Sequence, residues 1–300
     1  MFVPEEVRKS VVLIGAMERG VFKPQATGFL VLAFQRRIPD LAFPYLVTAE
    51  HVVADMHRNR TDVYCRLNLR DGTAIVEPLG NKKWLVHPDE SQRTDVAILP
   101  FWINSAIIDH DYIPLFNRVD KNIQAMRPGL LALGSEVFAI ALFNTVYGKG
   151  RDIPIIRIGN IAAVPEGLVG TRHLGDIEAY LIELRSLAGL SGSPVFVNPT
   201  NVRRMEDASW SEHFFIGMVH GHSEAPALEE GDRAEHGLLN GGAVNAGIGI
   251  VVPAAKIVET LYQPDSVAQM RARAAARRQR DGVTRDLGVV PLPRRRHSFG

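Results

Sequence analysis

The sequence has very little cysteine and no long apolar run. Cys65 is the only cysteine among 300 residues, so no intrachain disulfide bond can form. Secreted domains usually rely on several disulfide bonds, whereas proteins of reducing compartments keep their thiols free. The first apolar run, residues 11–16, is too short for a signal peptide, and no other run approaches the length of a membrane span. These absences predict a cytoplasmic protein that does not enter a membrane.

Charge is unevenly distributed along the chain. Residues 263–300 hold nine arginines and three aspartates, a charge of +6, which against the total of +1 leaves −5 for residues 1–262. We therefore divide the chain into a domain, 1–262, and a basic helical or disordered tail, 263–300. A helix capped by Asp265 or Ser266 is expected over 267–280, and disorder is expected beyond Leu287. The tail lacks interleaved aromatics, so a solvated tail is favoured over nucleic-acid binding, with docking on the acidic domain as the alternative.

Short apolar segments separated by turn residues recur through the first 262 residues, which is typical of an all-β protein. A looser stretch, residues 104–134, separates two halves, and a helix is predicted from about Pro253 to Tyr262. Strands are predicted over 11–16, 28–34, 45–48, 62–69, 74–78, 84–87 and 96–100 in the first half, and over 136–142, 153–164, 179–184, 194–197, 214–219 and 247–252 in the second.

The turn Gly-Leu-Ser-Gly-Ser-Pro at 189–194 is the first chemical feature of the sequence. A nucleophilic serine needs a tight turn that exposes its hydroxyl and points backbone N–H groups at a developing oxyanion. Gly189 gives the chain the freedom that such a turn requires, and the N–H groups of Gly189 and Ser191 are the expected donors. Alone, the turn is equally compatible with an ordinary connection between strands.

Two further residues suit the same chemistry. His51 follows an apolar strand that ends in Thr-Ala, and imidazole is the side chain best suited to general-base work near neutral pH. Asp95 directly precedes a fully apolar strand, where a partly buried carboxylate can orient a histidine. Asp89 is the nearest rival, but no core strand follows it. The chain order His, Asp, Ser is that of chymotrypsin-type triads and not that of subtilisin or α/β-hydrolase triads.

The sequence resembles trypsin-like serine peptidases in the segments 27–31, 46–51, 95–99 and 189–194, and in the strands around 215–219 and 247–253. The likeness is greater to the bacterial, disulfide-free members, including HtrA-type enzymes, although no PDZ-like segment follows residue 262. It implies two six-stranded antiparallel β-barrels, about 10–115 and 130–262, with a C-terminal helix. It also implies a triad of His51, Asp95 and Ser191 in the cleft between them.

The resemblance further implies a protein or peptide substrate, hydrolysed through an acyl-enzyme intermediate without a cofactor. His220, Gly221 and His222 would lie on the cleft wall, and Arg185 near its floor would favour acidic side chains if it reached the pocket. Leu190 replaces the aspartate that pairs with a newly cut N-terminus in zymogen-activated members, so activation by such a cut is not expected. Ser193 replaces a usual glycine.

Three alternatives remain at this point. Gly-x-Ser-x-Ser at 189–193 superficially resembles the nucleophile elbow of α/β-hydrolases, but the final glycine and regular intervening helices are missing. His220 and His222 share one face of a strand, yet no second ligand cluster accompanies them, so no metal is assigned. The fold could instead serve as a non-catalytic binding or scaffold module, or as a latent protease that a partner activates.

Overall fold

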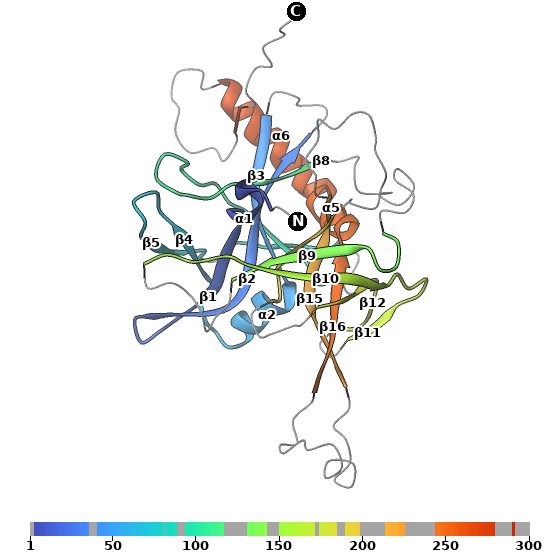
Figure 1. The fold of residues 1–300 in the computed structure, drawn as a ribbon. Coiled ribbons are helices and arrows are strands. Elements are labelled where there is room, and N and C mark those ends of the chain that lie inside the picture. Colours follow the sequence, from blue (N-terminus) through green and yellow to red (C-terminus); the bar gives the residue numbers. More distant parts are fainter. Residues whose placement is uncertain are drawn as a thin grey trace, which may run out of the picture.

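The computed structural model describes residues 3–35, 41–80, 82–88, 94–116, 131–142, 150–171, 174–184, 190–198, 214–225, 244–279 and 290–291, and every structural statement refers to these. Strands dominate the chain, and they form two large sheets side by side (Figure 1). None of the described helices is long and apolar enough to cross a membrane.

The first half folds into a nine-stranded sheet in which seven strands follow the order β5-β4-β1-β2-β3-β7-β6. β8 adds parallel to β2, and β17, from the far end of the chain, adds antiparallel to β3. The strands are β1 (Val11–Glu18), β2 (Val21–Phe34), β3 (Leu41–Thr48), β4 (Tyr64–Asn68), β5 (Ala74–Pro78), β6 (Leu85–Val86), β7 (Ala97–Pro100), β8 (Ile113–Phe116) and β17 (Val290–Pro291).

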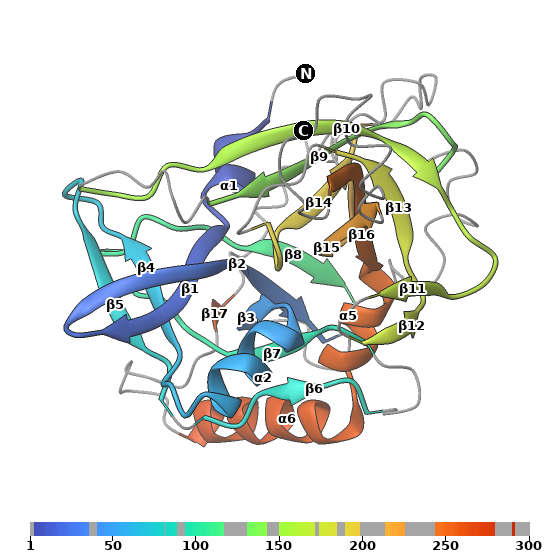
Figure 2. The same ribbon diagram turned by 90° about the horizontal axis from the view of Figure 1, so that it is seen from below.

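The second half is a closed six-stranded barrel in the order β10-β13-β16-β15-β14-β9. Figure 2 shows this barrel beside the first sheet, with the small β11–β12 hairpin at its edge. The strands are β9 (Glu136–Ala141), β10 (Ile155–Ala163), β11 (Val169–Thr171), β12 (Gly175–Ile177), β13 (Tyr180–Glu183), β14 (Pro194–Val197), β15 (Phe214–Ala225) and β16 (Val244–Pro253).

The predicted all-β class, with two barrel-like halves and a C-terminal helix, is confirmed. The first half is a nine-stranded sheet in place of the expected six-stranded barrel, because seven strands follow one path and β8 and β17 add to it. β8 lies in the stretch 104–134, where no strand was predicted. The helices α1 (Glu5–Arg8) and α2 (Glu50–Arg58) were not predicted either. Both begin without a side-chain cap from their own N-cap residue, so the usual start signal is missing from the sequence.

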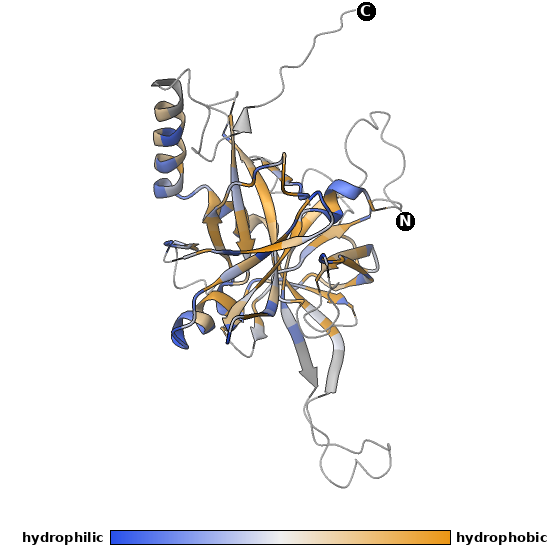
Figure 3. Cartoon of the chain, turned by 90° about the vertical axis from the view of Figure 1, so that its left-hand side faces the viewer, coloured by the Kyte–Doolittle hydropathy of each residue, from blue (hydrophilic) through white to orange (hydrophobic). Residues whose placement is uncertain are grey.

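Aromatic side chains and one threonine join the two halves. Phe29 on β2 packs against Phe215 on β15, with ring centroids 5.5 Å apart, and Phe215 contacts Phe196 on β14 at 5.7 Å. The hydroxyl of Thr27 accepts a hydrogen bond from the backbone N–H of Leu142 at 3.1 Å. In Figure 3 apolar colours predominate on the strands, whereas polar colours mark much of the last long helix.

The described residues of the C-terminal segment pack on the first half of the chain. After α5 (Ala254–Leu261), helix α6 (Pro264–Gln279) runs beside β6 and α2 (Figure 2). It buries Met270 and Ala274 in the core that the first sheet shares with neighbouring strands. The Arg273 guanidinium lies 5.8 Å from the centre of the buried Tyr45 ring, a cation–π contact. The chain then returns to pair β17 with the start of β3.

This arrangement corrects two expectations for the tail. The favoured solvated helix is wrong for the face of α6 that carries Met270, and the docking alternative describes that face. Disorder beyond Leu287 is wrong for Val290 and Pro291, which form a strand. The remaining residues of that stretch lie outside the described part of the chain.

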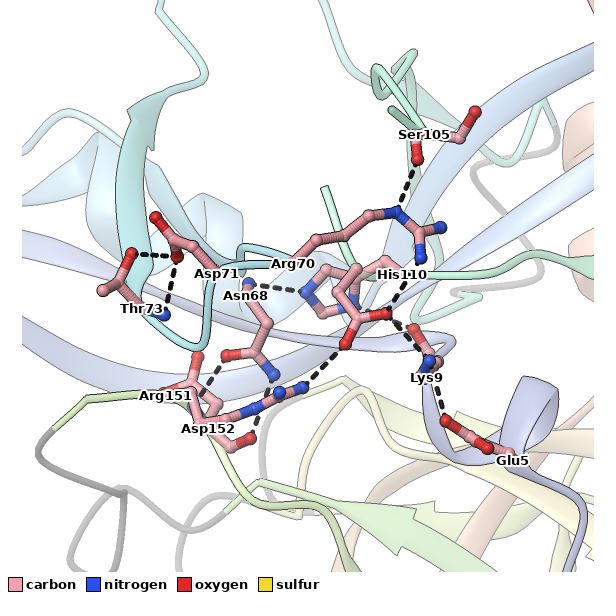
Figure 4. Close-up of polar contacts among 11 residues, drawn as sticks. Glu5, Lys9, Asn68, Arg70, Asp71, Thr73, Ser105, His110, Arg151 and Asp152 are labelled. Atoms are coloured by element: carbon pink, nitrogen blue, oxygen red, sulfur yellow. Dashed lines mark hydrogen bonds and ion pairs between the residues drawn. The ribbon is translucent and has the colours of Figure 1, made fainter. Parts of the chain in front are cut away.

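A buried polar cluster ties β4 to the segment that precedes β10 (Figure 4). Arg66 forms an ion pair with Asp152 at 2.6 Å. The Asn68 side chain accepts a hydrogen bond from the Asp152 N–H at 2.7 Å and donates one to the Asp152 carbonyl at 3.0 Å. The backbone N–H of Asn68 donates to Nε2 of His110 at 2.8 Å, so Nδ1 of His110 carries the proton that it donates to the Lys9 carbonyl.

Candidate active site

His51 stands in the first turn of α2, directly after β3. Val52, Val53 and Met56 are the buried side of this helix and fix its rotation on the core. The backbone N–H of His51 donates to Oδ1 of Asp95 at 2.8 Å. N–H groups in the first turn of a helix have no partner within the helix, and a carboxylate is favourable at that end. Asp95 therefore caps α2 from another part of the sheet and fixes the backbone of His51.

Asp95 lies just before β7 and is completely buried. Its Oδ2 accepts hydrogen bonds from Nδ1 of His51 at 2.8 Å and from Nδ1 of His220 at 2.5 Å. Burial by itself raises the pKa of Asp95, but the hydrogen bonds and charges of His220 and His51 outweigh it and hold the pKa well below its ordinary value of 3.8. The site thus contains an ionised carboxylate shared by two imidazoles.

His220 reaches Asp95 because of an irregularity in β15. The pairing of β15 with β16 shifts between Val219 and Gly221, which leaves His220 as the extra residue of a β-bulge. Bulges commonly redirect a side chain beside an active site. The His220 ring is only 4% exposed and meets the His51 ring edge-on, with centroids 5.2 Å apart. His220 was predicted to be a substrate contact on the cleft wall, whereas the structure places its ring against Asp95.

Ser191 lies in the turn before β14, and this turn is held against the first half. The backbone N–H of Thr27 donates to the Ser191 carbonyl at 3.0 Å. Gly192 has a φ of +82°, and a Cβ there would lie 1.9 Å from the carbonyl oxygen of Thr27. Only glycine combines this φ with so close an approach. Gly192 therefore lets the serine turn sit directly on β2, close to the end of β3 that precedes His51.

The hydroxyl of Ser191 donates to the backbone carbonyl of His220 at 2.9 Å. Between Ser191 and His51, both of them described, no side-chain hydrogen bond is formed. Within the described part of the chain the backbone N–H of Ser191 also has no acceptor, as an oxyanion donor requires. Gly189, the other predicted oxyanion donor, and Arg185, the predicted specificity residue, lie outside the described residues.

The neighbours of these residues complete the site. Leu190 is buried in the apolar core of the second barrel, as expected of a residue that forms no ion pair. The turn forms with Ser193 in place of the usual glycine, since the Ser193 N–H donates to the Leu190 carbonyl at 2.9 Å. Gly221 and His222, which follow His220 on β15, are partly exposed, and their predicted role in substrate binding stays a prediction.

His51, Asp95 and His220 also form a group with metal-ligand side chains, whose ligating atoms lie within 4.8 Å of one another. Both imidazoles, however, are in direct hydrogen-bond contact with one carboxylate oxygen, at 2.8 and 2.5 Å. A zinc ion needs about 2.0–2.2 Å to each such ligand, which would require the three side chains to move apart. In the described structure the three side chains are joined by hydrogen bonds, with Asp95 between the two imidazoles. We call His51, Asp95 and His220 the relay.

Glu50 is a further charged group near the relay. Its pKa is raised by burial and by the negative charge of Asp95. Glu50 also lines a cavity of about 450 Å³ with His57, Lys82 and Trp84, among others. The relay residues do not line this cavity, which is therefore separate from the site.

A sheet of this topology beside a closed six-stranded barrel, with His51 and Asp95 on the first half and Ser191 in the turn before β14 of the second, is the arrangement of the trypsin-like serine protease fold. Solved structures agree with this fold. The protease domain of MamO from Magnetospirillum magneticum, in its apo form, is similar with a TM-score of 0.51 and 15% identity, over 86% of this chain and 99% of that one. Because the identity is low, this likeness shows the fold alone.

Two other structures were found with lower scores. Deg5 has a TM-score of 0.45 and 18% identity over 72% of this chain and 81% of its own. The active form of the Rv3671c protease from M. tuberculosis has a TM-score of 0.43 and 17% identity over 85% of this chain and 80% of its own. No protein-family model and no curated protein matches the sequence.

Proposed function

We propose that this chain is a serine endopeptidase with His51, Asp95 and Ser191 as its triad. The observation that carries the proposal is the ionised, buried Asp95, which accepts both the backbone N–H and the ring Nδ1–H of His51. This double hydrogen bond fixes the imidazole in the tautomer whose Nε2 can accept a proton. A histidine held in this way is arranged to act as a general base.

The proposed reaction has two halves. The Ser191 hydroxyl attacks a peptide carbonyl carbon while His51 takes its proton, and the imidazolium then protonates the departing amine, which leaves an acyl-enzyme. Water attacks the acyl-enzyme with His51 again as base, and the serine is released with the carboxylic acid product. The N–H of Ser191, together with that of Gly189, would stabilise the negative oxygen formed in each half.

The hydrogen bond from Ser191 to the His220 carbonyl must break before this reaction starts. The reaction requires the Ser191 hydroxyl to leave that carbonyl and donate to the imidazole, and catalytic hydrogen bonds often form only with substrate bound. The same observation favours a second candidate, a latent or non-catalytic protease fold in which the serine stays on the His220 carbonyl.

A fluorophosphonate probe distinguishes the two candidates, because it modifies only an activated serine. We expect the probe to label the wild type. Turnover should fall on the order of a million-fold when Ser191→Ala or His51→Ala is introduced. Ser193→Ala is the matched control, since this buried hydroxyl has no partner among the described residues and belongs to the same turn. A folded wild-type protein that remains unlabelled would support the non-catalytic candidate, and labelling that survives Ser191→Ala would refute the triad.

A further inference from the structure

His220 touches all three members of the proposed triad. Its ring donates to Asp95, its ring edge meets the His51 ring, and its carbonyl accepts the Ser191 hydroxyl. The ring is almost completely buried, and the β-bulge of β15 turns it inward. A side chain placed in this way is not part of an ordinary core packing arrangement, because its hydrogen bond goes to the one carboxylate that orients His51.

The bond between His220 and Asp95 changes how the carboxylate charge is distributed. An ionised carboxylate can only accept hydrogen bonds, so Nδ1 of His220 and Nδ1 of His51 must both be donors to the same oxygen. Hydrogen bonds to a charged group are stronger than neutral ones, and burial of Asp95 excludes water as a substitute donor. Each imidazole therefore stabilises part of the negative charge of Asp95, and the interaction of that charge with the other imidazole is weaker than it would be alone.

We propose that His220 is a positioning residue that holds Asp95 in place and takes up part of its charge, so that His51 is a weaker base than it would be beside Asp95 alone. The importance of this role for catalysis rests on the proposed peptidase function. The effect of His220 on the basicity of His51 does not depend on that function.

Within the described part of the chain, the charged and titratable groups near His51 include Asp95, His220 and Glu50. Removal of the His220 donor leaves the negative charge of Asp95 concentrated on His51, which raises the pH at which His51 binds a proton. Removal of the negative charge of Glu50 has the opposite sign, because it weakens the attraction for a proton on His51. The two changes can therefore be told apart by their direction.

The experiment is an NMR titration of the His51 ring in a Ser191→Ala background, with the signal assigned by its loss in His51→Gln. His220→Asn and His220→Leu form a matched pair of nearly equal shape, of which only asparagine keeps a donor near the position of Nδ1. We expect His220→Leu to raise the His51 midpoint by roughly half to one pH unit. His220→Asn should leave it within a few tenths of a unit, and Glu50→Gln should lower it.

Equal midpoints for His220→Asn and His220→Leu, or a lower midpoint for His220→Leu, would overturn the proposal. If leucine beside the carboxylate prevents folding, His220→Ala takes its place and carries the same expectation. With Ser191 restored, the acidic limb of fluorophosphonate labelling should move in parallel with the midpoint. A wild type that is never labelled, but whose midpoints shift as expected, would refute the peptidase function and support the role of His220. Labelling of the wild type, together with a His51 midpoint that the His220 substitutions leave unchanged, would support the peptidase function and refute the role of His220.

Discussion

Asp95 and Asp152 are both buried at the junction of the two halves, yet their surroundings are opposite. Asp95 is 0% exposed and receives three donors, one from a backbone N–H and two from imidazoles. Asp152 is 2% exposed and pairs with Arg66 through Oδ1, while its Oδ2 has no partner in the described part of the chain. Burial raises the pKa of Asp152 to about 6 in spite of Arg66 and Arg151, whereas that of Asp95 is lowered.

Burial raises the pKa of both carboxylates, and the three donors around Asp95 outweigh this effect whereas the single ion pair of Asp152 does not. Each aspartate links the two halves. Asp95, just before β7, bonds to His220 on β15. Asp152, in the segment that precedes β10, bonds to Arg66 on β4. A site that needs a permanent negative charge is surrounded by donors on every side. A link that only needs to hold two segments together can leave one oxygen unsatisfied, at a cost that depends on pH.

Of the substitutions that compare the two aspartates, Asp95→Asn should produce the largest effect. The amide would present a donor where both Nδ1–H groups now donate, so His51 would be driven into the wrong tautomer. We expect the rate of fluorophosphonate labelling at pH 7 to fall by about 10⁴-fold, as when a triad aspartate loses its charge. Asp152→Asn removes the other buried carboxylate and is the matched control, expected to label within a few-fold of the wild type. An equal fall in both variants would mean that Asp95 has no special role.

Asn68→Ala tests how firmly the second link is held. The substitution leaves the N–H and the carbonyl of Asp152 without their side-chain partners, and each unpaired buried group costs about 1–3 kcal/mol. We expect the free energy of unfolding in urea to fall by about 2–4 kcal/mol. Asn59→Ala, at an exposed position after α2, should change it by less than about 0.5 kcal/mol. A loss no larger than that of Asn59→Ala would show that the link contributes little.

The same contrast explains what could be predicted from the sequence. Most strands carry their own apolar runs, and β5 and β14 have the predicted bounds. Ser191, His51 and Asp95 each stand next to such a strand, so their positions followed from local pattern and chain order. The ring of His220 could not be placed, because its direction depends on a bulge set by pairing with β16. Two histidines directly after the apolar segment 214–219 were the only available signal.

Other features depended on distant partners. The start of α2 is capped by Asp95, which lies 44 residues away, so no local cap marked it. The ion pair between Arg66 and Asp152 spans 86 residues, and neither neighbourhood indicates the other. The alanine–arginine sequence of α6 shows no clear apolar stripe, and its docking depends on Met270 and Ala274 meeting the first core. Charge asymmetry suggested docking only as an alternative.

The pH dependence of stability separates the two buried groups that meet at Asn68. Folding raises the pKa of Asp152 from 3.8 to about 6, so the folded state binds this proton more tightly and stability falls as pH rises through that window. Burial lowers the pKa of His110 from 6.5 to about 4, so stability from this group rises with pH over nearly the same window. Each change corresponds to about 3 kcal/mol, and the two nearly cancel in the wild type.

Asp152→Asn should remove one of these opposing contributions. The free energy of unfolding of the variant should match that of the wild type near pH 4 and then rise more steeply, by up to about 3 kcal/mol at pH 7. The charges of Lys9, Asp109 and Arg151 around His110 are common to both proteins and do not enter the difference. Asp62→Asn, which removes a carboxylate from an exposed position, should run parallel to the wild type. If Asp152→Asn also ran parallel, Asp152 would be ionised throughout, and the unsatisfied oxygen would not distinguish it from Asp95.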